Sequence, residues 1–142
     1  ASAVKQVFVD ASGLIGVLNT RDQWHARASE LWAEFIDAGT PLVTTTLVLI
    51  ELADALARCE FRRLAVEARD RLLQWEQVDV VVISPLEERR AWDLYRDRSD
   101  KAWGMTDCTS MIVMQDRHIA QVLTADRHFE QAGFETLLKT RG

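Results

Sequence analysis

The sequence predicts an α/β fold: a three-layer α/β/α sandwich in which helices cover both faces of a central parallel sheet of four to five strands. Two observations predict this fold. Short apolar runs rich in β-branched residues alternate along the chain with longer segments that carry apolar residues at helical spacing. The first run, Val7–Val9, is apolar throughout, as is typical of a strand buried on both faces. The 142 residues are expected to form one domain, residues 1–142, with a sizeable core.

Strand composition and helix-start signals place the elements along the chain. Val78–Ile83 is the clearest strand because most of its residues are β-branched. Asp22, Thr46 and Thr106 precede apolar residues at helical spacing and are expected to cap helices. Pro85 stands at a first-turn position that tolerates proline. The expected strands are 4–9, 42–45, 78–83, 120–124 and 134–138, and the expected helices are 14–18, 23–35, 47–59, 61–76, 85–95, 107–116 and the turn 129–132.

Four acidic residues lie where an ordinary surface charge fits poorly. Asp10 ends the first strand, and Asp126 follows the strand end at Thr124 by two residues. Glu51 lies among apolar residues of a predicted helix, where a charge is costly unless it is paired or bound to a cation. Asp107 stands at a helix start, where the helix dipole favours an anion. Because ligands of parallel sheets bind outside the carboxyl ends of the strands, we expect Asp10, Asp107 and Asp126 at that edge.

Each of these acids also has a purely structural interpretation. Asp10 would cap the following helix, Asp107 would be a favourable first-turn residue, and Asp126 would shape a turn. Glu51 would pair with an arginine such as Arg58. These interpretations require four coincidences at one edge of the sheet. A cluster of four carboxylates is instead the kind of site that a hard divalent cation such as Mg²⁺ or Mn²⁺ prefers.

The segments that carry these acids form an ordered set. They are VFVDASGLI at 7–15, TTTLVLIEL at 44–52, MTDCTS at 105–110 and LTADRHFEQAGF at 123–134. This set, with its acids at 10, 51, 107 and 126, resembles the motifs of the PIN-domain nucleases. Within that family it resembles the VapC-type toxins of bacterial toxin–antitoxin pairs. The resemblance covers nearly the whole chain and implies a PIN-like α/β/α domain.

The resemblance implies a metal-dependent endoribonuclease. Asp10, Glu51, Asp107 and Asp126 would be both the catalytic residues and the metal ligands, holding one or two Mg²⁺ or Mn²⁺ ions. Such ions activate water for in-line attack on an RNA phosphodiester and neutralise the charge that grows on the phosphate. Without metal the four carboxylates repel one another, so at least one of them is expected to have a raised pKa.

Other polar and aromatic residues lie near the four acids. Ser12, Thr106 and Thr124 flank three of them and are expected to orient them by hydrogen bonds, although capping would equally explain Thr106. His128 is interpreted as an ordinary residue of the turn before the last helical segment. Trp103, in a polar loop before Asp107, is the tryptophan considered for base stacking.

Composition limits the choice of partners only partly. The net charge is −5, but 14 of the 17 basic residues are arginine, which suits phosphate contacts, so charge neither supports nor excludes a nucleic acid. No apolar run is long enough for a membrane span, and with no export signal the cytoplasm is the expected location. The resemblance implies an RNA substrate, a homodimer and a cognate antitoxin protein.

Several other functions remain open on the sequence alone. Within the family, the alternatives are a non-toxin PIN nuclease in RNA processing and a catalytically silent RNA-binding or scaffold domain; retention of all four acids speaks against a silent domain. A DNA substrate is a further alternative. A phosphatase with Asp10 as nucleophile usually carries a second aspartate two residues later, where this chain has Ser12.

Overall fold

A five-stranded, all-parallel sheet forms the centre of the protein. The computed structural model describes residues 5–138. The strands are ordered β3-β2-β1-β4-β5 across the sheet. Their bounds are Val7–Val9 (β1), Leu42–Thr45 (β2), Val78–Val81 (β3), Gln121–Leu123 (β4) and Glu135–Thr136 (β5). The helices are Ala11–Leu18 (α1), His25–Ala38 (α2), Thr46–Ala55 (α3), Cys59–Gln74 (α4), Pro85–Asp97 (α5), Met105–Asp116 (α6) and Arg127–Gln131 (α7).

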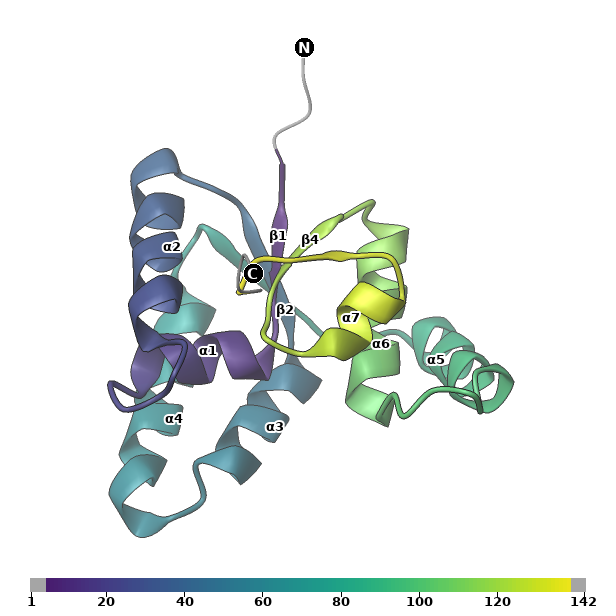
Figure 1. Cartoon of the computed structure of the whole chain (residues 1–142), viewed down its shortest axis with the longest axis horizontal. Coiled ribbons are helices and arrows are strands. Elements are labelled where there is room, and N and C mark those ends of the chain that lie inside the picture. The colour runs from purple at the N-terminus through teal and green to yellow at the C-terminus, as the bar shows by residue number, and fades with distance from the viewer. Residues whose placement is uncertain (1–4, 139–142) are drawn as a thin grey trace.

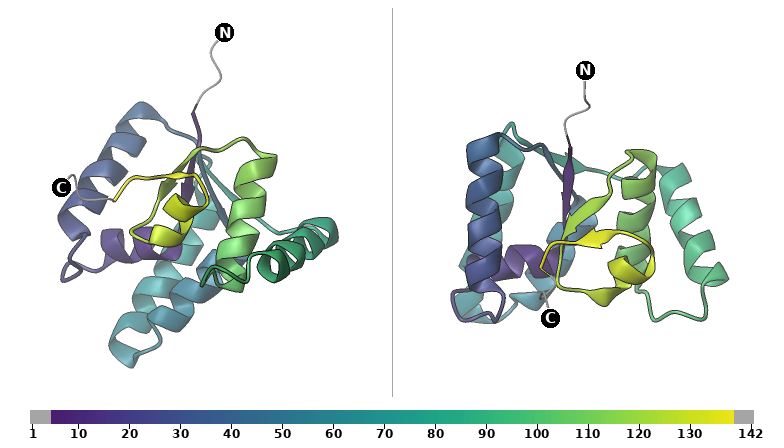
Figure 2. Two further views of the ribbon diagram at one scale, coloured as in Figure 1. Left: turned by 45° about the vertical axis from the view of Figure 1, so that its right-hand side comes forward. Right: turned by 45° about the horizontal axis from the view of Figure 1, so that its top comes forward.

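Helices cover both faces of this sheet. Figures 1 and 2 show α1, α2 and α4 on one side of the strands and α5 and α6 on the other. The central strands are buried on both faces, and Val7, Phe8 and Val9 are each at most 2% exposed. The predicted three-layer α/β/α fold with a parallel sheet is therefore confirmed. Within the described residues, no helix is both long enough and apolar enough to span a membrane.

The order of the strands places a topological switch point between β1 and β4, at the centre of the sheet. The chain adds β2 and β3 on one side of β1 and then returns to add β4 and β5 on the other side. The connections after β1 and β4 therefore leave the sheet in opposite directions, which is where open α/β sheets bind ligands. Asp10 follows β1 and Asp126 lies three residues after β4, so both acids lie at this point.

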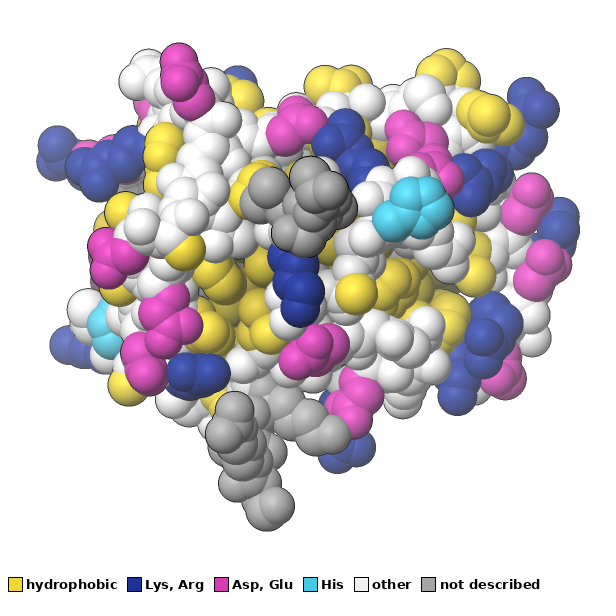
Figure 3. Space-filling model, turned by 90° about the horizontal axis from the view of Figure 1, so that it is seen from above, with side chains coloured by type: hydrophobic (Ala, Val, Ile, Leu, Met, Phe, Trp, Pro, Cys, Tyr) yellow, Lys and Arg dark blue, Asp and Glu magenta, His cyan; other side chains and the backbone are white. Residues whose placement is uncertain are grey.

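The amino ends of the strands face the opposite way. Figure 3 shows the molecule from this side, with acidic and basic side chains interspersed and apolar side chains between them. No single sign of charge dominates the visible face. This face therefore shows no large patch of one charge.

Several predicted helix starts are wrong by a few residues. Thr45, not Thr46, caps α3, because the Thr45 hydroxyl accepts a hydrogen bond from the Val48 amide at 3.1 Å. Asp22 accepts from the Trp24 amide at 2.9 Å and so caps the turn before α2 rather than the helix itself. The long helix predicted to run to Cys59 ends at Ala55, and α4 begins at Cys59.

The start of α6 differs in a way that affects the acidic residues. The helix begins at Met105, so Thr106 lies inside it and does not cap it. Asp107 instead accepts a hydrogen bond from the Gly104 amide at 3.0 Å and closes the first turn. The last strand is also shorter than predicted, with only Glu135–Thr136 paired to β4. Val4, the predicted first residue of β1, lies outside the described residues.

Gly13 permits α1 to approach β4 closely. A Cβ atom built at Gly13 would meet the Leu123 side chain at 2.8 Å and would come closer still to the Leu123 carbonyl oxygen. The same carbonyl accepts the Asp10 amide at 3.2 Å. The absence of a side chain at Gly13 therefore permits the close approach, and the Asp10 hydrogen bond joins the end of β1 to the end of β4.

We expect Gly13→Ala to destabilise the protein by about 1–3 kcal/mol, the usual cost of overpacking a tight site, even though alanine favours helices. Gly16→Ala, in the same helix, is the matched control, because the atom nearest to its Cβ would be the Ala28 methyl carbon at 3.0 Å and the Trp24 atoms would lie at 3.6 Å or more. Urea denaturation of both variants measures the difference. A Gly13→Ala variant as stable as the wild type would show that the α1–β4 approach is not tight.

Candidate metal centre

Asp10 places a carboxylate inside the protein at the end of β1. The residue is 3% exposed. Its Oδ2 atom accepts a hydrogen bond from the Thr124 hydroxyl at 2.9 Å, with the Ser12 hydroxyl at 3.4 Å. Its Oδ1 atom is buried and has no hydrogen-bond partner within residues 5–138. One oxygen of the carboxylate is thus satisfied and the other is left available.

A small hydroxyl network joins the ends of β1 and β4. The Ser12 and Thr124 hydroxyls are 2.8 Å apart. The Ala125 amide donates to Ser12 Oγ and the Asp126 amide donates to Thr124 Oγ1, each at 3.1 Å. The two side chains therefore fix both the Asp10 carboxylate and the backbone that leads to Asp126.

Glu51 reaches the same region from α3. Its side chain is partly buried, and it is hydrogen-bonded to Thr106 in the first turn of α6. Among residues 5–138, Glu51 makes no ion pair with Arg58 or another arginine, so arginine pairing does not account for its position there. Thr106 therefore orients Glu51, an acid from another helix, rather than its neighbour Asp107.

Asp107, Asp126 and His128 come together on the other side of the site. His128 Nδ1 is hydrogen-bonded to Asp107 Oδ2 at 2.8 Å and lies 3.2 Å from Asp126 Oδ1. One potential ligand atom from each of these residues lies within 4.8 Å of the others. Asp126 also accepts from the His128 amide at 3.0 Å and so caps α7. The short α7 turn thus brings the imidazole back onto two of the predicted acids.

Burial and mutual repulsion disfavour the charged forms of these acids. Burial raises the pKa of Asp10 to about 7, the Thr124 hydrogen bond opposes this rise, and the charges of Glu51 and Asp107 add to it. Burial also raises the pKa of Glu51, with a further contribution from the charge of Asp107. The expectation that at least one carboxylate has a raised pKa is therefore confirmed. The four acids interact electrostatically as one cluster.

The residues present fit a hard divalent cation. Carboxylate oxygens are the ligands that Mg²⁺ and Mn²⁺ prefer, and an imidazole suits Mn²⁺ less well but is compatible with it. The unpartnered Asp10 Oδ1 is costly to bury as an anion, and a neighbouring cation removes that cost. Asp107, Asp126 and His128 form the tightest potential ligand group, while Asp10 and Glu51 add charge beside it.

Two sequence interpretations are changed by the structure. His128, interpreted as an ordinary turn residue, contacts two of the predicted acids. Trp103, considered for base stacking, is only 6% exposed, donates from its indole N–H to Gln131 at 3.0 Å, and has the Arg98 guanidinium over its ring. Its ring is therefore not available to a base.

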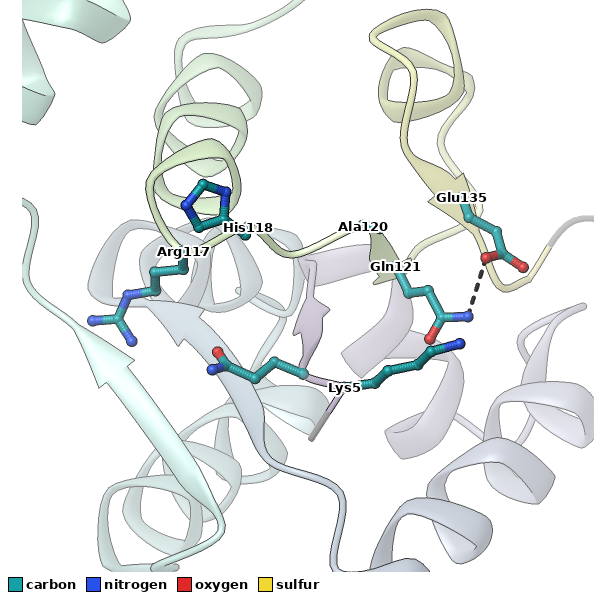
Figure 4. A pocket seen from close by; sticks show the side chains of 7 residues that line it. Lys5, Arg117, His118, Ala120, Gln121 and Glu135 are labelled. Carbon is teal, nitrogen blue, oxygen red and sulfur yellow. Dashed lines mark hydrogen bonds between the residues drawn. The ribbon is translucent and has the colours of Figure 1, made fainter. Parts of the chain in front are cut away.

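A pocket at the opposite edge of the sheet has different properties. Figure 4 shows this pocket of about 500 Å³, lined by residues that include Lys5, Arg117 and His118. Arg117 donates to Asp79 at 2.6 Å, and Gln121 donates to Glu135 at 3.0 Å. These polar groups are already paired, and none of the predicted acids reaches this edge. The carboxyl edge is therefore the candidate site.

An acidic cluster at the switch point of an α/β/α sheet defines a candidate metal-dependent hydrolase. The PIN domain family model matches residues 7–135. The chain belongs to the PIN domain family, since this match covers most of its length.

Among solved structures, the chain is similar to the crystal structure of Mycobacterium tuberculosis VapC20, a sarcin–ricin loop cleaving toxin. The two share 29% sequence identity with a TM-score of 0.81, over 90% of this chain and 95% of that chain. A comparison with curated protein sequences gives no match. The family and structural matches support the predicted ribonuclease toxin and do not favour the alternatives.

The raised pKa of Asp10 predicts how the metal-free protein responds to pH. The folded state binds a proton at Asp10 that the unfolded chain releases near pH 4, so this group stabilises the protein at low pH. We expect that stability to be lost as pH rises from about 4 through 7, by up to about 4 kcal/mol. Denaturation in EDTA between pH 5 and pH 8 measures it.

Asp10→Asn is expected to flatten this dependence and to be more stable than the wild type at pH 8. Asp37→Asn, which removes one charge from an exposed position of α2 that makes no ion pair within the described residues, is the control for a general effect of charge. The same slope in wild type and Asp10→Asn would contradict the assignment of the raised pKa to Asp10.

Proposed function

We propose that this protein is a divalent-metal-dependent endoribonuclease that acts as the toxin of a toxin–antitoxin pair. The observation that carries the metal dependence is the half-satisfied Asp10 carboxylate beside the Asp107–Asp126–His128 group. PIN family membership and the similarity to VapC20 support the nuclease activity itself. Mg²⁺ and Mn²⁺ both suit the ligand set, and the cation supplies activation of water and neutralisation of phosphate charge when bound.

The side chains of the site have distinct proposed roles. Asp10, Glu51, Asp107 and Asp126 hold the cation directly or through water. His128 contributes a nitrogen beside Asp107 and Asp126, close enough to ligate the cation or to hold an oxygen of the substrate.

Three hydroxyl groups have proposed positioning roles. Ser12 and Thr124 hold Asp10 in place. The Thr124 hydrogen bond also favours the ionised form of Asp10, because it lowers the pKa of the carboxyl group. Thr106 does the same for Glu51 from the first turn of α6.

The substrate and partners follow from the same reasoning. VapC20 is a toxin that cleaves the sarcin–ricin loop, so an RNA oligonucleotide that forms this loop is the first defined substrate to test. A toxin of this class implies an antitoxin protein that neutralises it. Homodimerisation, one domain over residues 1–142 and a cytoplasmic location stay predictions from the sequence.

Asp107→Asn is expected to abolish cleavage, because it removes the charge of the acid that contacts both His128 and the first turn of α6. Replacing groups that only orient metal ligands commonly costs 10- to 100-fold, so we expect a loss of at least about 100-fold here. The measurement is cleavage of a mixed RNA pool and of the sarcin–ricin loop oligonucleotide with Mg²⁺, Mn²⁺ or EDTA.

Asp116→Asn, at the far end of the same helix, is the matched control and should cleave like the wild type. Cleavage that survives in EDTA, or equal cleavage by Asp107→Asn, would refute a metal-dependent site at Asp107.

Thr124→Val is expected to weaken Mn²⁺ binding by about 10- to 100-fold at neutral pH. The variant keeps the shape of the buried side chain but removes the hydrogen bond that favours the ionised form of Asp10. Titration calorimetry with Mn²⁺ measures the affinity. Thr40→Val, in the turn before β2, is the control, and an unchanged affinity in Thr124→Val would exclude a positioning role for Thr124.

A further inference from the structure

An exposed aromatic pair lies on α5, beside the candidate metal centre. Trp92 is 54% exposed and Tyr95 is 48% exposed, and they are the exposed aromatic side chains of the described residues. Their rings meet edge to face, with centroids 5.9 Å apart and planes at 74°. Both residues thus keep about half of their surface exposed. Adjoining exposed apolar groups of this kind often mark an interaction site.

The pair lines a pocket that adjoins the carboxyl edge of the sheet. The pocket has a volume of about 560 Å³ and is lined by Trp92, Tyr95, Ser99, Lys101, Ala102, Trp103, Gly104 and Met105. Gly104 and Met105 begin α6, and the Gly104 amide donates to Asp107 Oδ2, the oxygen that also contacts His128. One wall of the pocket is thus hydrogen-bonded to an acid of the cluster.

The charge of the pocket suits a polyanion. Lys101 is the charged residue of its lining, and its ammonium group makes no ion pair within residues 5–138. Arg98 covers the ring of Trp103 and is held by both carboxylate oxygens of Asp100, at 3.0 and 3.1 Å. The floor of the pocket is therefore fixed. Lys101 makes an electrostatic interaction with the neighbouring Asp100 but no close ion pair among the described residues, and the aromatic pair is exposed.

From this geometry we propose that Trp92 and Tyr95 form a stacking subsite for an unpaired base of the RNA, next to the phosphodiester that is cleaved. The inference rests on the proposed function and adds the residues that would hold an unpaired base of the RNA. Bases stack on exposed aromatic rings in single-strand-binding proteins, with a basic side chain contacting the backbone. Lys101 supplies the contact to the RNA backbone here. The RNA chain would pass Gly104 on its way to the acids.

The test measures binding separately from cleavage. The full chain carrying Asp107→Asn is titrated against two fluorescein-labelled probes of equal length: oligoadenylate and an abasic oligonucleotide with the same backbone. Trp92→Ala in this background is expected to weaken oligoadenylate binding by about 5- to 150-fold, which is the usual cost of losing one stacked base. Binding of the abasic probe should not change, and Trp92→Phe, which keeps a ring, should retain most of the affinity.

Leu86→Ala is the matched control, because Leu86 is equally exposed on the same helix but does not line the pocket. Unchanged oligoadenylate binding in Trp92→Ala would overturn the proposal, as would an equal loss for both probes or no oligoadenylate binding before substitution. Loss of a dimer on light scattering, with RNA binding intact, would make this face a protein interface instead and also overturn it.

The proposed nuclease function is tested by a different readout. Wild-type chain that binds oligoadenylate through Trp92 but cleaves no RNA with Mg²⁺ or Mn²⁺ would support the stacking subsite and refute the nuclease. Wild-type chain that cleaves RNA equally with and without Trp92 would support the nuclease and refute the subsite.

Discussion

Asp10 carries its carboxylate into the interior, where an anion has to be hydrogen-bonded or bound to a cation. Several neighbouring residues position this carboxylate. The close approach of α1 to β4 at Gly13 brings Thr124 within 2.9 Å of Asp10 Oδ2, and Ser12 completes the same network. Within residues 5–138 the other oxygen, Oδ1, has no hydrogen-bond partner, and the nearby charges of Glu51 and Asp107 further disfavour the ionised form of Asp10. A divalent cation bound there would relieve the unfavourable electrostatics of this carboxylate.

The fold and the acidic residues could be predicted because both depend on patterns that are local in the chain. An apolar run that ends in Asp10 already fixes that acid at a strand end, and parallel strands bring their ends to one edge. The start of α6 could not be predicted as well. Gly104 and Asp107 close its first turn by a hydrogen bond, and Thr106 is hydrogen-bonded to Glu51, which lies on α3. Neither contact is visible in the local sequence pattern.

His128 and Trp103 were interpreted wrongly because their roles depend on tertiary contacts. His128 belongs to a turn that is ordinary in sequence, and only the packing of α7 beside α6 brings its Nδ1 to Asp107. The one available signal was its position two residues after Asp126, an acid already predicted as a ligand. Trp103 lies in a polar segment that suggests exposure, but Arg98 and Gln131 enclose it. Neither partner is apparent from the sequence nearby.

The outer position of α5 has a consequence for how such a protein diversifies. The helix packs against α6 through the buried Ala91 and the partly buried Leu94. Its exposed side chains lie outside the core, so natural or designed variation at those positions meets few packing constraints. The acids of the candidate site lie on other elements, so such changes leave them in place. Under the proposed base-stacking role of Trp92 and Tyr95, a new preference for the RNA target is therefore reachable by altering this one helix, while the acids of the site keep their places.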